Sequence, residues 1–197
     1  MKLLSTIIVC LMVLPCGVLA EPSPPKIVAR AEWKAAEPRT ALMRRQEPKE
    51  IVVHHTGEPQ RASLSIERKL RNLQDFSFRP GRVGAHAKPA WGDVPYHYYI
   101  DLHGRVAEGR DIQYAGDTNT GYDTLNLIQI VVEGNFEKER PAREQLEALK
   151  ELISWLSEKY RIDPHLVFGH GDKAKTDCPG KYLKPYIATL RTGPQNR

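Results

Sequence analysis

The stretch Glu50-Ile-Val-Val-His-His-Thr56 decides how this chain can fold. Its contiguous β-branched residues are typical of a strand that is buried on both faces. A second apolar run, Leu-Ile-Gln-Ile-Val-Val, covers residues 127–132, and a shorter one covers residues 166–168. We therefore expect three buried strands, with His54 at the C-terminal end of the first.

Helical periodicity fills the intervals between these strands. Apolar residues recur at spacings of three and four over residues 63–76 and 142–160, and Pro141 stands where a helix start tolerates proline. A last short helix is expected over residues 185–190. Each of the three buried strands is thus followed by a helical segment.

Shorter strands complete the prediction. Residues 96–101 and 105–108 alternate around the turn His103-Gly104 and predict a hairpin. Residues 79–94, rich in glycine and basic residues, predict a loop in which Trp91 is exposed as a lid or contact residue. The order of elements predicts an α/β fold: a single domain with a mixed central β-sheet flanked by helices.

The N-terminus predicts a secreted or periplasmic protein. Met1-Lys2, a short apolar run and Val18-Leu19-Ala20 form the pattern of a secretory signal peptide. A lipoprotein anchored at Cys16 is the less favoured alternative, because Pro15 precedes it. The chain then divides into a signal peptide (1–20), a Pro-rich lead-in (21–29), one folded domain (30–190) and a C-terminal tail (191–197).

The net charge and residue composition indicate which kinds of molecule the protein could bind. The formal charge of +5 fits work near an anionic cell envelope. The chain has no basic run, phosphate-binding glycine loop or zinc-finger spacing, so we expect no nucleic acid partner. After signal removal no apolar run is long enough to cross a membrane. We expect a monomer.

Cys178 is the only cysteine outside the signal peptide, because Cys10 and Cys16 lie within it. A disulfide within one mature chain is therefore excluded. A zinc ion would protect a lone thiol in an oxidising compartment, whereas the alternative is a buried, inert cysteine. The polar residues 175–177 argue against an apolar burial site.

His54 and His170 each end a predicted buried strand, and Cys178 follows His170 after seven residues. Two imidazoles and a thiolate suit Zn²⁺, and a fourth position left for water marks a catalytic site. Either histidine could instead be a satisfied core residue, and a structural zinc site is least favoured because no fourth ligand is evident. His54 and His55 point to opposite faces of a strand, so only one can reach the metal.

Several motifs together carry a resemblance over residues 30–187: Arg30-Ala-Glu-Trp33, Val52-Val-His-His-Thr56, Val94-Pro-Tyr-His-Tyr98, Gly104-Arg-Val-Ala-Glu-Gly-Arg110, Glu133-Gly-Asn-Phe136, and Phe168-Gly-His through Cys178-Pro-Gly180. The chain resembles the type 2 N-acetylmuramoyl-L-alanine amidases, a family that includes phage amidases and animal peptidoglycan recognition proteins. The resemblance implies zinc-dependent hydrolysis of the amide between N-acetylmuramic acid and L-alanine in peptidoglycan or muropeptides.

The resemblance also implies roles for single residues. His54 rather than His55 is the ligand, beside His170 and Cys178. Tyr96 matches the catalytic tyrosine, and Thr176 falls where these enzymes carry Lys or Thr beside the zinc. Tyr96 as a core aromatic and Thr176 as an ordinary loop residue are the alternatives.

For the remaining candidate residues, both a functional and a structural role are open. Glu133 ends a predicted strand and could be the general base or a structural partner. Asp117 and Gln129 depart from the family pattern, in which many relatives have a His and a Gly at these places. Candidate contacts to the sugar or stem peptide, or else plain surface and packing residues, are Trp91, Arg110 and Asn119.

Three functions remain open: the zinc amidase, a module that binds peptidoglycan without cutting it, and a zinc amidase acting on another amide. Non-catalytic members of the family have typically lost the metal-binding cysteine. Since this chain keeps Cys178, we favour the enzyme.

Overall fold

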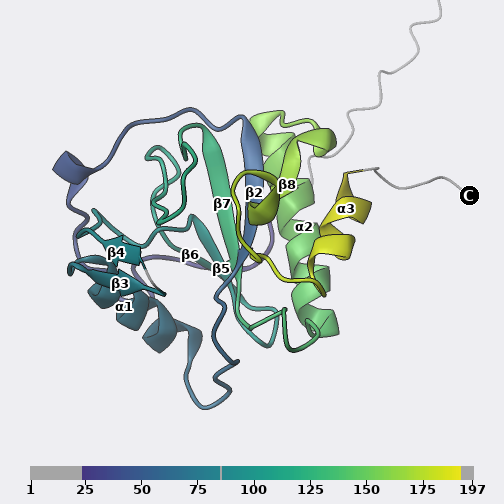
Figure 1. Ribbon diagram of the computed structural model, residues 1–197, viewed down its shortest axis with the longest axis horizontal. Helices are drawn as coiled ribbons and strands as arrows, with labels where there is room; N and C mark the ends of the chain where they lie inside the picture. The colour runs from purple at the N-terminus through teal and green to yellow at the C-terminus, as the bar shows by residue number, and fades with distance from the viewer. Residues whose placement is uncertain (1–23, 85, 192–197) are drawn as a thin grey trace, which may run out of the picture.

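A six-stranded mixed sheet forms the centre of the computed structural model, which describes residues 24–84 and 86–191 (Figure 1). Across the sheet the strands are β1 (Ile27–Val28), β6 (Val106–Glu108), β5 (Tyr98–Ile100), β7 (Leu127–Val132), β2 (Glu50–His55) and β8 (Val167–Gly169). Only the β5–β6 pair is antiparallel. The predicted mixed α/β fold is confirmed.

The three predicted buried strands lie side by side in the sheet. β2 pairs in parallel with β7 along its whole length and with β8 from Ile51 to Val53. Every residue of β7 is buried, as its unbroken apolar sequence indicates. β8 begins one residue later than expected, because Leu166 ends a short 3₁₀ helix, η2 (Pro164–Leu166). Parallel pairing brings the C-terminal ends of β2, β7 and β8 to one edge.

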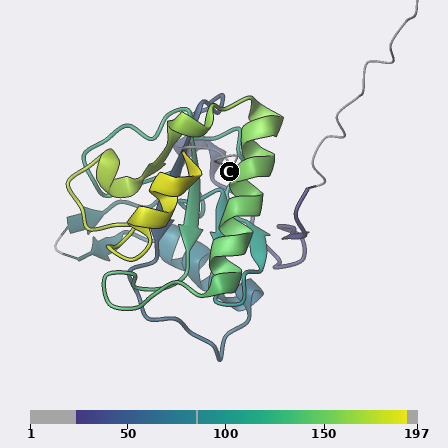
Figure 2. The same ribbon diagram turned by 90° about the vertical axis from the view of Figure 1, so that its right-hand side faces the viewer.

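Helices cover both faces of the sheet (Figures 1 and 2). α2 (Arg143–Tyr160) and α3 (Lys184–Leu190) pack on one face, called here the α2 face, and α1 (Ile66–Ser77) packs on the other, the α1 face. Helix α1 begins later than predicted, since the Ser65 side chain accepts a hydrogen bond from Arg68 N and caps it. The remaining 3₁₀ turns are η1 (Thr40–Leu42) and η3 (His170–Asp172).

The segment 79–94 contains a two-stranded hairpin, β3 (Gly81–Val83) and β4 (His86–Lys88), where a loop was expected. The expectation of an exposed Trp91 is wrong, since this residue is only 8% exposed. Its ring meets Phe76 edge-on and lies 4.4 Å from the Lys88 ammonium. Lys88 Nζ also donates to three backbone carbonyls, so a satisfied buried cation holds this tryptophan in place.

Part of the predicted lead-in belongs to the fold. Ile27 and Val28 form the edge strand beside Val106 and Ala107, and Val28 is packed in the core. The predicted signal peptide and all but Arg191 of the predicted tail lie outside the described residues. Within residues 24–84 and 86–191, none of the helices combines the length and apolarity needed to span a bilayer.

Candidate metal centre and its pocket

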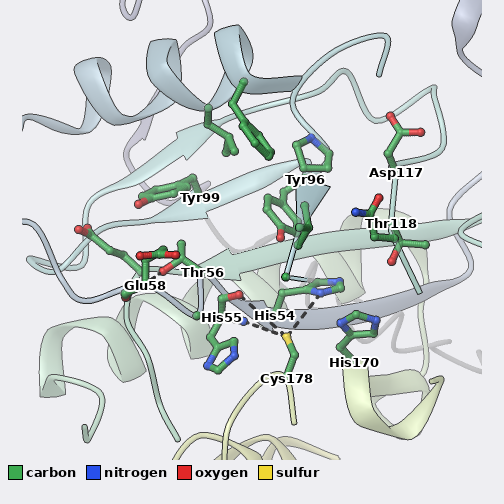
Figure 3. Close-up of a pocket in the computed structure, with 18 of the residues that line it drawn as sticks. His54, His55, Thr56, Glu58, Tyr96, Tyr99, Asp117, Thr118, His170 and Cys178 are labelled. Atoms are coloured by element: carbon green, nitrogen blue, oxygen red, sulfur yellow. Dashed lines mark hydrogen bonds between the residues drawn. The ribbon is translucent and has the colours of Figure 1, made fainter. Parts of the chain in front are cut away.

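Three side chains from distant parts of the chain meet at the C-terminal edge of the sheet (Figure 3). His54 lies near the end of β2, His170 directly follows β8, and Cys178 lies on the loop that comes after η3. One ring nitrogen of each histidine and the cysteine sulfur all lie within 4.8 Å of one another. His54 Nδ1 is 3.8 Å from Cys178 Sγ, so the sequence-predicted set is assembled in space.

The adjacent histidines have different surroundings, as strand alternation requires. The ring of His54 is 3% exposed and faces His170, with ring centroids 4.6 Å apart. The ring of His55 points away from this cluster, and its Nδ1 accepts a hydrogen bond from Phe136 N at 3.1 Å. The backbone N–H of His55 donates to Cys178 Sγ at 3.4 Å and so helps to position the thiol.

Hydroxyl groups surround His170. Thr120 Oγ1 lies 2.7 Å from His170 Nε2, which leaves Nδ1 as the ring nitrogen free to face the cluster. The Tyr122 ring lies 5.1 Å from the His170 ring. Sequence reasoning missed both residues, because lone Thr and Tyr residues in a loop carry no spacing signal and only the fold brings them to the site.

Burial controls the charge of the three groups. It lowers the pKa of His54 well below its usual value, and the nearby His170 lowers it further. Burial also lowers the pKa of His170 to about 4 and raises the pKa of Cys178 to about 12. Both imidazoles are therefore neutral near pH 7, the form that binds metals, while a cation would be needed to stabilise the thiolate.

The donor set fits zinc. Two neutral imidazoles and one thiol supply the N and S ligands that Zn²⁺ prefers, and no fourth His, Cys, Asp or Glu joins this cluster among the described residues. The cluster lies at the wall of a cavity of 760 Å³, a volume in the usual range for small-ligand sites. The cavity extends over α1 and β3, and its wall includes the candidate residues Trp91, Tyr96, Asn119, Glu133 and Thr176.

Tyr96 and Thr176 lie beside the cluster. The Tyr96 ring is 5.2 Å from the His54 ring, and burial raises the pKa of its phenol, so the hydroxyl remains a donor. Thr176 Oγ1 accepts a hydrogen bond from Cys178 N at 3.2 Å and shapes the cysteine loop. Asn119 also lines the cavity, and its buried Nδ2 has no hydrogen-bond partner in the protein.

Glu133 has the contacts of a structural carboxylate. Lys69 Nζ donates to Oε2 at 2.8 Å within a fully buried ion pair. Leu102 N also donates to Oε2, and Arg61 N donates to Oε1 at 2.8 Å. These bonds occupy the lone pairs of the carboxylate and hold it in place. The contacts support the structural alternative for Glu133.

Arg110 is committed to the protein interior. Its guanidinium donates to Val94 O at 2.9 Å, to Asp93 O at 3.1 Å and to Ala115 O, and it pairs with Asp117. The side chain is 3% exposed and lies outside the large cavity. The contacts support the packing alternative for Arg110, which holds residues 93–117 together.

Comparison with known proteins agrees with this architecture. The Amidase_2 family, N-acetylmuramoyl-L-alanine amidase, matches residues 44–181. Peptidoglycan-recognition protein SD of Drosophila simulans is 32% identical over 168 residues, which cover 82% of this chain and 83% of that protein.

Solved structures extend the comparison. The crystal structure of Drosophila peptidoglycan recognition protein SD superposes with a TM-score of 0.68 at 31% identity, covering 82% of this chain and 92% of that one. An endolysin N-acetylmuramoyl-L-alanine amidase, LysCS from Clostridium intestinale, reaches a TM-score of 0.62 at 26% identity, covering 86% and 97%. This chain therefore belongs to the N-acetylmuramoyl-L-alanine amidase family, which matches most of its length and whose fold it shares.

Proposed function

We propose that this protein is a zinc-dependent N-acetylmuramoyl-L-alanine amidase that acts on peptidoglycan or muropeptides. The observation that carries the proposal is the convergence of His54, His170 and Cys178 at the wall of a large cavity. Membership of the amidase family supports the choice of substrate bond.

The ligands would be His54 Nδ1, His170 Nδ1 and Cys178 Sγ. His54 Nδ1 is the ring nitrogen near the sulfur, and His170 Nε2 is engaged by Thr120. When bound, zinc supplies Lewis acidity, which polarises a carbonyl and makes water a stronger acid.

The other residues act on the substrate through hydrogen bonds. The Tyr96 hydroxyl donates to the oxygen of the scissile amide as negative charge develops there, with Thr176 beside the same centre. Burial keeps the pKa of Tyr96 above its usual value, so this donor retains its proton at neutral pH. Asn119 Nδ2 and Trp91 are the proposed contacts to the sugar or stem peptide.

The alternative is a module that binds peptidoglycan without cutting it. Several related proteins are named as recognition proteins, which favours binding as a shared property of the fold. The complete His–His–Cys set in this chain favours the enzyme. We further propose that residues 1–20 direct secretion and that the mature protein is a monomer.

Product analysis separates these functions. Purified peptidoglycan is incubated with the protein lacking residues 1–20, with zinc or with a chelator, and the products are identified by mass spectrometry. Stem peptides with a free L-alanine amine, released only with zinc, are expected. Intact glycopeptides in both samples, with protein sedimenting on the wall, would leave binding as the function. Release from soluble muropeptides alone would restrict the substrate to fragments.

The adjacent histidines provide a matched pair of variants. His54→Ala removes a proposed ligand and should abolish both zinc binding and release of stem peptides. His55→Ala removes a neighbouring imidazole whose Nδ1 bonds to Phe136 N, and should keep its zinc. Equal zinc affinity in the two variants would overturn the ligand assignment.

A further inference from the structure

A buried glutamine stands beside the metal centre. Gln129 is the only polar residue of β7 and its side chain is fully buried. In the parallel register Val52 faces Gln129 and His54 faces Val131, so the side chains of His54 and Gln129 lie on the same face of the sheet. Burying an amide is unfavourable unless its donors and acceptor find partners, so its contacts need an explanation.

Two neighbouring residues, Tyr122 and Gly116, determine where the Gln129 side-chain amide lies. Tyr122 Oη donates to Gln129 Oε1 at 3.1 Å. On another side lies Gly116, where an added Cβ would come within 2.0 Å of Gln129 Nε2. The absence of a side chain at Gly116 therefore makes the space that the amide occupies.

Two buried nitrogens on the α1 face have no hydrogen-bond partner: His54 Nε2 and Gln129 Nε2. Gln129 lies two register positions before the His54–Val131 pair, so the side chains of Gln129 and His54 are diagonal neighbours on this face. A neutral imidazole that binds a metal through Nδ1 carries its proton on Nε2. Both groups would then present donors and neither would offer an acceptor, which is a mismatch.

A half-turn of the amide removes the mismatch. It brings Gln129 Oε1 toward His54 Nε2–H and turns Gln129 Nε2 toward the Tyr122 hydroxyl, which can accept as well as donate. Both unpartnered nitrogens then have acceptors. The same change leaves the lone pair of His54 Nδ1 facing Cys178 Sγ, 3.8 Å away.

We propose that Gln129 is a positioning residue for the metal centre: its amide oxygen accepts a hydrogen bond from His54 Nε2–H and fixes the tautomer whose Nδ1 is free to bind zinc. Tyr122 orients the amide in turn. The inference rests on the proposed zinc site. It gives His54 a partner equivalent to Thr120 on His170, the kind of outer contact that orients metal-bound imidazoles.

Two variants test this role. Gln129→Leu removes the acceptor while keeping most of the volume, and Gln129→Glu keeps an acceptor and removes the amide donor. Zinc affinity is measured by competition with a chelator, and the tautomer of His54 is read from ¹⁵N chemical shifts in metal-free protein. We expect wild type and Gln129→Glu to hold the proton on Nε2. We expect Gln129→Leu to lose this preference and bind zinc about 10- to 100-fold more weakly.

Gln145→Leu is the matched control. It removes another fully buried amide, one that donates to Glu133 O and accepts from Ala142 N at the start of α2. This variant should lower the melting temperature and leave zinc affinity unchanged. Should Gln145→Leu weaken zinc binding as much as Gln129→Leu, the effect at Gln129 would be one of general destabilisation and the proposal would fail.

The outcomes are separable. Unchanged zinc affinity and tautomer in Gln129→Leu, or a proton on His54 Nδ1 in metal-free wild type, would overturn the role of Gln129. If Gln129→Leu does not fold, Gln129→Glu decides, because a shift of the proton to Nδ1 in that variant contradicts the proposal. A wild-type protein that binds no zinc would refute the proposed function, while the tautomer would still report on Gln129.

Discussion

The two faces of the central sheet are formed by the same strands but differ in the polarity of their buried side chains. The α2 face is apolar, with a core formed by residues such as Ile51, Val53, Ile128, Ile130, Leu149, Leu152 and Leu156. The α1 face carries buried polar groups from the same strands and their ends: His54, His97, Gln129 and Glu133. Alternation along each strand thus leaves the α2 face to apolar packing alone. The α1 face combines the polar groups with a second apolar cluster, which includes Ile66, Leu70 and Val131.

The difference shows how a small domain can hold a polar site without losing its core. Helices α2 and α3 seal the α2 face, while α1 leaves the 760 Å³ cavity open beside the metal cluster. Substitutions of the cluster residues on the α1 face should therefore remove zinc binding. Substitutions of structural polar groups on that face, such as Lys69, and of apolar residues on the α2 face should alter stability and leave zinc affinity unchanged.

The largest effect is expected for Cys178→Ala. Loss of the only sulfur donor should remove tight zinc binding and reduce amidase activity below detection, because two imidazoles alone hold zinc weakly. Zinc content by elemental analysis and product release by mass spectrometry are the measurements. The metal-free variant should unfold at nearly the temperature of metal-free wild type. A fully active Cys178→Ala protein would show that the metal assignment is wrong.

Lys69→Met should be the most destabilising change on the α1 face. It leaves Glu133 buried without its cation, which costs roughly 3–5 kcal/mol in comparable sites. Denaturant unfolding measures the loss.

Glu133→Gln tests whether the other member of the Lys69–Glu133 ion pair is structural or a general base. If the carboxylate is structural, kcat of the folded variant should stay within about tenfold of wild type, whereas loss of a general base typically costs roughly 10²–10⁴-fold. A drop of that size with unchanged zinc content would make Glu133 the proton acceptor.

Leu152→Ala probes the α2 face. Leu152 is fully buried on α2, and truncating such a residue costs about 2–5 kcal/mol through lost burial and the cavity left behind. Zinc affinity of the folded variant should match wild type. A tenfold change in zinc affinity would show that the two faces are coupled.

Acidification should give the smallest effect, and it should come from the α1 face. Burial holds the pKa of folded His97 at about 4 against 6.5 for the unfolded chain, so unfolding takes up a proton between these values. Above pH 6.5 His97 is neutral in both states and does not lower the free energy of unfolding. As pH falls from 6.5 to about 4, the free energy of unfolding decreases, by at most about 3 kcal/mol from this residue. Unfolding of metal-free protein at pH 7 and pH 4.5, compared with His97→Gln, measures it. An equal pH dependence in the variant would exclude His97 as a cause.

Much of the sheet was predictable because its strands are locally marked. The β-branched run at residues 51–53 and the apolar run at 127–132 indicate burial without any knowledge of neighbours. The hairpin β3–β4 was not predictable, because its exposed residues Gly81 to Val83 carry no alternation. The prediction of an exposed Trp91 was wrong because the sequence does not show that Lys88, a residue type usually found at the surface, is buried against its ring.

The residues of the candidate site also fall into two groups: those that the sequence predicts and those that only the fold reveals. His54, His170 and Cys178 were predictable because each type is rare and stands at a strand end or beside one. The partners Thr120, Tyr122 and Lys69 were not, since their contacts join segments 50 to 64 residues apart or depend on which face a loop covers. For Arg110 the sequence could not decide between a surface and a packing role, because it does not show that backbone carbonyls accept from the guanidinium.

The distance along the chain between the cluster's members has a consequence for biogenesis. His54 and Cys178 are 124 residues apart, and the sulfur follows the last strand of the sheet. No partial translation product that stops before residue 178 can assemble the cluster, so capture of the proposed zinc ion would be a late event in the life of the polypeptide. A cell that secretes this chain unfolded would deliver it without its ion, and the supply of metal outside the membrane would then limit how much protein matures.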